Sequence, residues 1–191
     1  DIVTVEDKEY DGGHTAVVHC EDVKMINVHT SEEINDYSVW LEADGEFESK
    51  DVSDEQKKVT VSKFRLEGND RNKFKLSGNY DKVEKYAYIT PKELKVIPKE
   101  TWIYYGQAIP ENFEYTVEQP EECNVDLNVK IAVQGEPKNI GEYDYVILEQ
   151  TSDNPNYIGK ISESSKFRIK EYSPEEKYGT KKYLFLFSNR G

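Results

Sequence analysis

One ordered set of short motifs occurs twice in this sequence, once in each half, and this repeat constrains the fold more than any other feature. Each copy begins with a short strand pattern, a Lys and a turn that ends in Gly, then continues through an aromatic-rich strand to an Asn-X-aromatic corner. The opening turns are Tyr10-Asp11-Gly12 and Tyr104-Tyr105-Gly106, and the corners are Asn72-Lys73-Phe74 and Asn154-Pro155-Asn156-Tyr157. A repeated supersecondary pattern predicts two tandem modules in an extended architecture, and argues against a single catalytic globule.

The residue composition favours β-structure throughout. The chain contains 14 Tyr, and its short apolar runs are rich in Val, Ile and aromatic residues, which suit half-buried pleated surfaces. We therefore predict an all-β chain of two small antiparallel β-sandwich modules of the immunoglobulin-like kind. The structural alternative is a pair of β-grasp-like modules with one short helix at Ser31–Asn35, where Ser31 could act as the N-cap. A shift in the apolar period within 59–66 also predicts a β-bulge near Ser62-Lys63.

Proline marks the expected boundary between the modules. Pro91 keeps the preceding residue extended and cannot donate a ladder hydrogen bond, so it should end one sheet and begin the next. The predicted modules are 1–91 and 92–172. The tail 173–191 contains the apolar run Tyr183–Phe187, which either adds a strand to the second module or begins a further repeat.

These motifs resemble two known families of modules. The first half resembles a YDG domain, through Lys8–Gly12, Leu66-Glu67-Gly68, Asn72–Phe74 and Ile89–Lys92. The second half resembles an MBG domain of the Tyr-Gly-X type, through Tyr105-Gly106, Pro110, Asn139–Tyr143 and Asn154–Tyr157. Gly13-His14 and the acidic stretch around Asp44-Gly45-Glu46 depart from the YDG pattern. The resemblance implies tandem repeats of an exported, adhesin-like bacterial surface protein.

Charge and cysteine content narrow the expected partners. The net charge is −13, which disfavours nucleic acids and anionic membranes. No apolar run is long enough to span a bilayer, so we expect no direct insertion into a membrane. Cys20 and Cys123 fall one per module, and we expect both to be reduced. The chain begins within a strand pattern, without a signal peptide, so we expect it to be a piece of a longer exported protein located at the cell surface.

Three groups of residues are candidates for sites. Tyr10, Asp11, Gly12, Tyr105 and Gly106 are predicted to be structural turn residues, because Gly supplies the left-handed conformation of a tight turn. The acidic stretch that contains Asp44, Glu46 and Glu48 has the oxygens that Ca²⁺ needs but lacks a calcium-loop spacing, so a solvated hairpin is favoured and no metal is predicted. Of the consecutive residues Trp102–Tyr105, at least two must face away from one core.

The exposed aromatic side chains leave two interpretations open. Trp102, Tyr104 and Tyr105 form either a platform for sugars or peptides, or a surface that packs against a neighbouring module. No motif for nucleophilic catalysis or phosphate binding is present, so we predict no enzyme activity, no catalytic residue and no cofactor.

The expected function is a non-catalytic structural and adhesive repeat segment of an exported bacterial surface protein. It would act as a stalk, with host or matrix glycans or proteins and neighbouring repeat modules as partners. The alternative is a carbohydrate-binding accessory module of a secreted enzyme.

Overall fold

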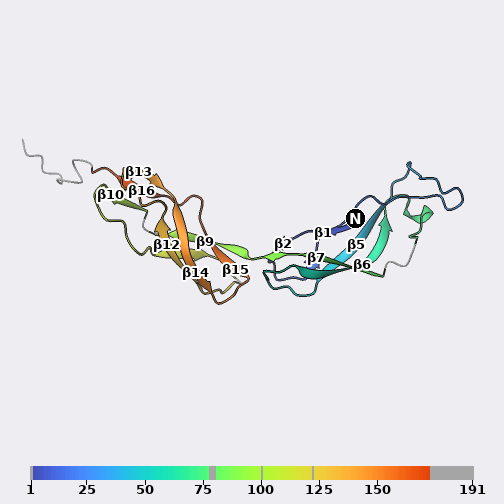
Figure 1. Cartoon of the computed structure of the whole chain (residues 1–191), viewed down its shortest axis with the longest axis horizontal. Coiled ribbons are helices and arrows are strands. Elements are labelled where there is room, and N and C mark those ends of the chain that lie inside the picture. The colour runs from blue at the N-terminus through green and yellow to red at the C-terminus, as the bar shows by residue number, and fades with distance from the viewer. Residues whose placement is uncertain (1, 78–80, 100, 122, 173–191) are drawn as a thin grey trace, which may run out of the picture. The chain divides into compact units, whose positions relative to one another are not determined.

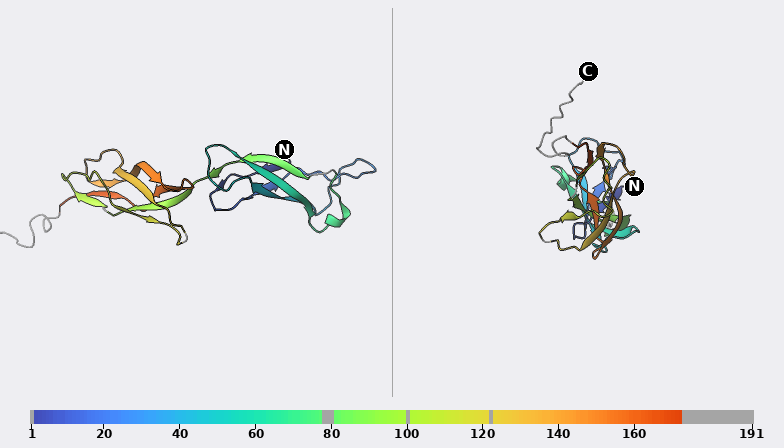
Figure 2. Two further views of the ribbon diagram at one scale, coloured as in Figure 1. Left: turned by 90° about the horizontal axis from the view of Figure 1, so that it is seen from below. Right: turned by 90° about the vertical axis from the view of Figure 1, so that its left-hand side faces the viewer.

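The computed structural model describes residues 2–77, 81–99, 101–121 and 123–172. The chain forms two compact units. Strands of both units are labelled in Figure 1, and Figure 2 shows the chain from two further directions. The first unit consists of Asp1–Lys92 together with Asn154–Tyr157. The second consists of Glu93–Asp153 together with the described residues from Ile158 onward. Four residues from late in the sequence are therefore part of the first unit. The sequence motifs did not indicate this.

The described residues contain β-strands and one 3₁₀ turn (η1, Arg71–Lys73), but no α-helix. The all-β prediction is therefore confirmed. The short helix that the β-grasp-like alternative placed at Ser31–Asn35 is not formed, because this segment belongs to a hairpin in which Ile26 and Glu33 form a bridge. Ser31 has a φ of 61°, whereas an N-cap residue needs extended dihedral angles. The tail 173–191, including the predicted strand at Tyr183–Phe187, lies outside the described residues.

The first unit is built on a four-stranded sheet with two smaller ladders beside it. Its strands are β1 (Val3–Val5), β2 (Lys8–Glu9), β3 (Thr15–Ala16), β4 (Val18–Cys20), β5 (Trp40–Phe47), β6 (Lys57–Glu67), β7 (Lys82–Ala87) and β8 (Ile89–Thr90). The order in the large sheet is β3-β5-β6-β7, and Figure 1 shows the last three side by side. β1 pairs antiparallel with β4, whereas β2 pairs in parallel with β8.

Alternation of side chains along these strands produces the core of the first unit. Val59 and Val61 on β6 are fully buried, and they pack in one cluster with Phe47, Ala87 and Ile89. The predicted bulge is confirmed, because the β5–β6 register shifts between Glu42 and Asp44, opposite Lys63. Lys63 lies in this bulge and has a φ of 55°.

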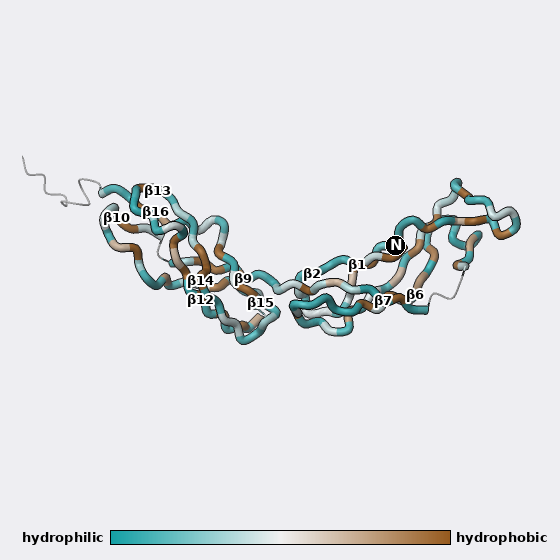
Figure 3. Tube along the Cα trace, in the orientation of Figure 1, coloured by the Kyte–Doolittle hydropathy of each residue, from teal (hydrophilic) through white to brown (hydrophobic). Residues whose placement is uncertain are grey.

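The described strands of the second unit form three sheets. Its strands are β9 (Lys92–Pro98), β10 (Trp102–Tyr104), β11 (Tyr115–Glu118), β12 (Leu127–Val133), β13 (Gly141–Tyr143), β14 (Tyr145–Ser152), β15 (Tyr157–Ile161) and β16 (Phe167–Lys170). The strand orders are β11-β9-β15, β10-β16-β13 and β12-β14. β10 pairs in parallel with β16, and β9 pairs antiparallel with β11. In Figure 3 the hydrophobic residues of β9, β12 and β14 are drawn in brown within this unit.

An aromatic cluster fills the core of the second unit. Phe167 on β16 has no exposed surface, and its ring meets those of Phe113 and Tyr145 edge to face, with centroids 5.8 and 6.1 Å away. Leu94 and Val96 on β9 are also buried. Among the described residues, no helix is long and apolar enough to cross a membrane.

Candidate functional site

The opening turn of the first unit is held by Lys8 and Asp11. The Lys8 ammonium donates to Asp11 Oδ1 at 2.7 Å and to the Gly13 carbonyl at 2.7 Å, and the Gly13 N–H also donates to Asp11 Oδ1, at 2.8 Å. These hydrogen bonds stabilise the charged carboxylate, so the hydrogen bond from Lys8, followed by that from Gly13, holds the pKa of Asp11 below 3.8. Gly12 has a φ of 78°, the left-handed conformation that this turn requires.

The corresponding turn of the second unit contains Tyr105 and Gly106. Gly106 has a φ of 86°, and a Cβ added to it would meet no atom within 4 Å. The Tyr104 N–H donates to Gln107 Oε1 at 2.7 Å across the turn. The positive φ of Gly12 and Gly106 accounts for the glycine in each of the two signatures.

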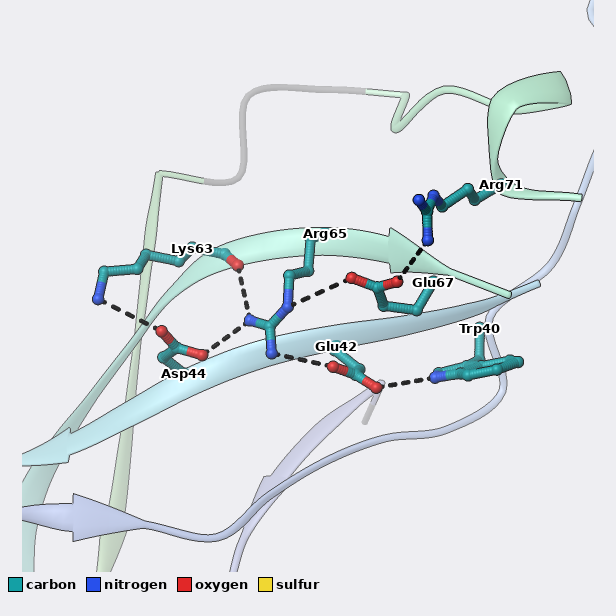
Figure 4. Close-up of polar contacts among 7 residues, drawn as sticks. All are labelled: Trp40, Glu42, Asp44, Lys63, Arg65, Glu67 and Arg71. Carbon is teal, nitrogen blue, oxygen red and sulfur yellow. Dashed lines mark hydrogen bonds and ion pairs between the residues drawn. The ribbon is translucent and has the colours of Figure 1, made fainter. Parts of the chain in front are cut away.

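The acidic stretch on β5 lies within a cluster of charged side chains, which Figure 4 shows on the exposed face of the β5–β6 hairpin. Arg65 donates to Asp44 Oδ1 at 2.7 Å and to Glu42 Oε2 at 2.9 Å, and Lys63 donates to Asp44 Oδ2 at 3.3 Å. Arg71 pairs with Glu67 at 3.2 Å. Because three carboxylates (Glu42, Asp44 and Glu67) face three cations (Lys63, Arg65 and Arg71), the cluster is neutral.

This pairing engages the carboxylate oxygens of Asp44, one of the weak cation candidates, with Arg65 and Lys63. The hydrogen bonds from Arg65 and Lys63 lower the pKa of Asp44, and its oxygens already face cations. Glu48 instead accepts the backbone N–H of Lys58 at 3.2 Å, so it closes the hairpin. Within the part of the chain that the structure describes, no three His, Cys, Asp or Glu side chains gather as they would around a metal ion.

The two aromatic residues of β10 lie on one face of the strand. Trp102 and Tyr104 lie two residues apart on the outward face, with ring centroids 5.0 Å apart. Tyr104 stacks on Tyr172 with centroids 4.0 Å apart, and the Lys170 ammonium lies 4.4 Å from the centre of the Trp102 ring. We call Trp102, Tyr104, Lys170 and Tyr172 the aromatic face. Ile103, which lies between Trp102 and Tyr104 in the sequence, is buried.

Tyr105 is not part of the aromatic face. It lies beyond the end of β10 and lines a groove with Gly106, Pro137 and Lys138. The sequence placed all three aromatic residues in one candidate platform, and the structure brings together only Trp102 and Tyr104. Lys170 and Tyr172 were missed, although the β16 alternation of exposed and buried residues places Lys170 opposite Tyr104 in the β10–β16 register.

Both cysteines are free thiols. Cys20 and Cys123 are each half-buried. Burial, followed by the nearby Glu42 carboxylate, raises the pKa of Cys20. A raised pKa keeps the thiol protonated and unreactive at neutral pH.

Comparison with known proteins bears on the first half of the chain. Residues 1–82 match the YDG domain family. This confirms the YDG resemblance for that region, and the match ends at the first residue of β7. No curated protein and no solved structure matches the chain.

Proposed function

We propose that the chain is a non-catalytic structural and adhesive repeat segment of an exported bacterial surface protein. In this proposal the second unit is an MBG-like module that follows a YDG module, and both are immunoglobulin-like in arrangement. The observation that carries the proposal is that the two units share one construction. In each, the second strand, β2 or β10, leads into a positive-φ glycine turn and pairs in parallel with a later strand near the exit of the unit, β8 or β16.

This pairing suits a module that carries a load. In a parallel pair, the start of one strand and the end of the other lie at opposite ends of the ladder. A pull that enters at β2 and leaves at β8 therefore acts along the strands and loads their hydrogen bonds together, in shear. The same holds for β10 and β16.

Single-molecule pulling tests the structural role. When the full chain is pulled from its ends, it should unfold in two events, one for each unit. Each unit should unfold at a higher force in this direction than when it is pulled across its sheet through engineered cysteines. Cys20→Ser and Cys123→Ser provide the background for these attachments. Equal forces in both directions would contradict a load-bearing role.

The aromatic face supports a second candidate, a carbohydrate-binding accessory module of a secreted enzyme. Exposed rings beside a cation offer apolar and polar contacts to a sugar. Lys170 already covers part of the Trp102 ring, however, and Tyr172 stacks on Tyr104. These internal contacts reduce the ring surface left for a ligand, so we rank this function second.

Binding assays separate the two candidates. The full chain is tested against insoluble polysaccharides, host-type glycans and matrix proteins, beside Trp102→Ala and the control Tyr105→Ala. Polysaccharide binding that Trp102→Ala alone removes would favour the accessory module. Binding confined to host glycans or matrix proteins would favour the adhesive segment.

A further inference from the structure

The hairpin loops of the two units correspond residue for residue. Phe47 pairs with Val59 at the end of the β5–β6 ladder, and Val133 pairs with Tyr145 at the end of the β12–β14 ladder. The intervening segments, 48–58 and 134–144, have the same length; the first includes the start of β6 and the second includes β13. The first residue of each donates its N–H to the carbonyl of the last, Glu48 to Lys58 at 3.0 Å and Gln134 to Asp144 at 2.8 Å. Lys138 therefore occupies the position of Val52.

The opening turns correspond in the same way. The Tyr10 N–H donates to the Thr90 carbonyl at 2.9 Å, and the Tyr105 N–H donates to the Lys170 carbonyl at 2.7 Å. Each acceptor follows a buried isoleucine on the exit strand, Ile89 or Ile169. Tyr105 therefore occupies the position of Tyr10, so the true correspondence is one residue away from the one that the Tyr-X-Gly motifs indicate.

In the first unit, Asn154–Tyr157 covers the surface between this turn and this loop. The Val52 N–H donates to Asn156 Oδ1 at 2.7 Å, and Asn156 Nδ2 donates to Asp51 Oδ1 at 3.0 Å. The Tyr157 ring meets the Tyr10 ring edge to face, with centroids 5.4 Å apart. Asn156 is only 7% exposed, so a specific polar contact is buried here.

In the second unit, the corresponding surface is an open groove of about 720 Å³. Its lining includes Tyr105, Pro137 and Lys138, with Ile169 among the apolar lining residues. No residue of the described ranges accepts a hydrogen bond from the Lys138 N–H. The lining of the groove thus includes Lys138, the counterpart of Val52, and Tyr105, the counterpart of Tyr10.

We propose that this groove is a docking site for an Asn-aromatic turn, of the type of Asn154–Tyr157, presented by another module of the same construction. The Asn side chain accepts a hydrogen bond from the Lys138 N–H, and the aromatic ring packs against Tyr105. Pro137 stands in the place of Asp51, so the docked Asn makes one contact fewer than Asn156 does. This proposal rests on the proposed function, because it assumes that such modules occur in series.

The test is a titration of the full, ¹⁵N-labelled chain with a cyclic peptide of residues 152–159. The amide signals of Lys138 and Tyr105 should shift saturably, and a matched peptide with Asn156→Ala should leave them unmoved. The Val52 amide is the internal control, because its acceptor is already in place. Absence of a shift, or equal shifts with both peptides, counts against the site.

A second measurement removes the dependence on the peptide's conformation. The sequence of residues 93–172 is appended directly after Tyr172, the position that corresponds to Lys92. Hydrogen exchange at the Lys138 amide of the original second unit should be about tenfold slower, or more, than in the chain without the added copy. Asn156→Ala in the added copy alone should reverse this effect. Unchanged exchange beside a folded added copy, together with a negative titration, would overturn the proposal. Failure of the load-bearing function would appear only in the pulling experiment, which does not report on this amide.

Discussion

At the scale of the residue, three glycines with positive φ differ in what a side chain would meet. A Cβ at Gly106 would contact nothing within 4 Å, so Gly106→Ala should cost about 1 kcal/mol through backbone strain alone. A Cβ at Gly68 would lie 2.2 Å from the Ser38 carbonyl oxygen, so Gly68→Ala should cost clearly more. Gly12, with a φ of 78° and only the Tyr10 hydroxyl 4.0 Å away, should behave like Gly106. Urea unfolding of each variant gives the comparison.

Gly13 provides the control within the same turn. Its φ is not in the left-handed region, and its closest contact would be Asp11 Oδ1 at 3.4 Å. Gly13→Ala should therefore change the free energy of unfolding much less than Gly12→Ala. Equal costs at the two positions would show that the positive φ of Gly12 does not set the need for glycine there. Intact stability with lost ligand binding in Gly12→Ala or Gly106→Ala would mark that turn as a recognition site.

Asp11 makes the first unit sensitive to acid. Its folded pKa lies below the unfolded value near 3.8, because the charged form accepts hydrogen bonds from Lys8 and Gly13. The folded state therefore gains stability above the unfolded pKa and loses it as the pH falls through the folded pKa. Unfolding followed from pH 6 downward should show this loss in the wild type and a shallower one in Asp11→Asn. Parallel pH profiles would exclude Asp11 as a contributor.

At the scale of the element, β16 should carry much of the stability of the second unit. It is the central strand between β10 and β13, and Phe167 packs its ring against Phe113 and Tyr145. Phe167→Ala should cost about 3–5 kcal/mol, through lost transfer free energy and the cavity left behind. Fluorescence of Trp102 in a Trp40→Phe background follows this unit, and Phe167→Leu, which leaves a smaller cavity, should cost less.

The sequence predicted elements best where side-chain alternation alone decides them. The all-β class followed from the composition and the strand patterns along the chain, and the bulge near Ser62-Lys63 followed from the shifted apolar period within 59–66. The helix that the structural alternative placed at Ser31–Asn35 is not formed. A capping pattern is local, whereas the bridge between Ile26 and Glu33 and the positive φ of Ser31 depend on the hairpin.

The candidate sites could be predicted only in part. Alternation on β10 places Trp102 and Tyr104 on one face, but Lys170 joins them through a strand that lies far away in sequence. Likewise, no spacing rule connects Asp44 to Arg65, which meet across the β5–β6 hairpin. The membership of Asn156 in the first unit depends on side-chain hydrogen bonds to Asp51 and Val52, and no local pattern encodes such bonds.

At the scale of the whole molecule, the first unit is not continuous in sequence, and this gives a sharp prediction for Asn156. Asn156→Ala would remove the acceptor of the Val52 N–H and the donor to Asp51, at a site where little water enters. Loss of a buried hydrogen-bond partner costs about 1–3 kcal/mol. The variant should therefore lower the stability of the first unit, although its position is 64 residues beyond Lys92, from 92 to 156.

The two tryptophans make this measurable. Trp40 lies in the first unit and Trp102 in the second, so Trp102→Phe leaves a reporter for the first unit alone. In that background, Asn156→Ala should move the urea midpoint of the Trp40 signal to lower concentration. The control is Asn128→Ala, an exposed Asn that donates only to its neighbour Asp126 at 3.1 Å and should leave the midpoint in place. An unchanged Trp40 midpoint in Asn156→Ala would mean that Asn156 does not stabilise the first unit. An Asn-aromatic turn would then not be expected to stabilise the corresponding groove of the second unit either.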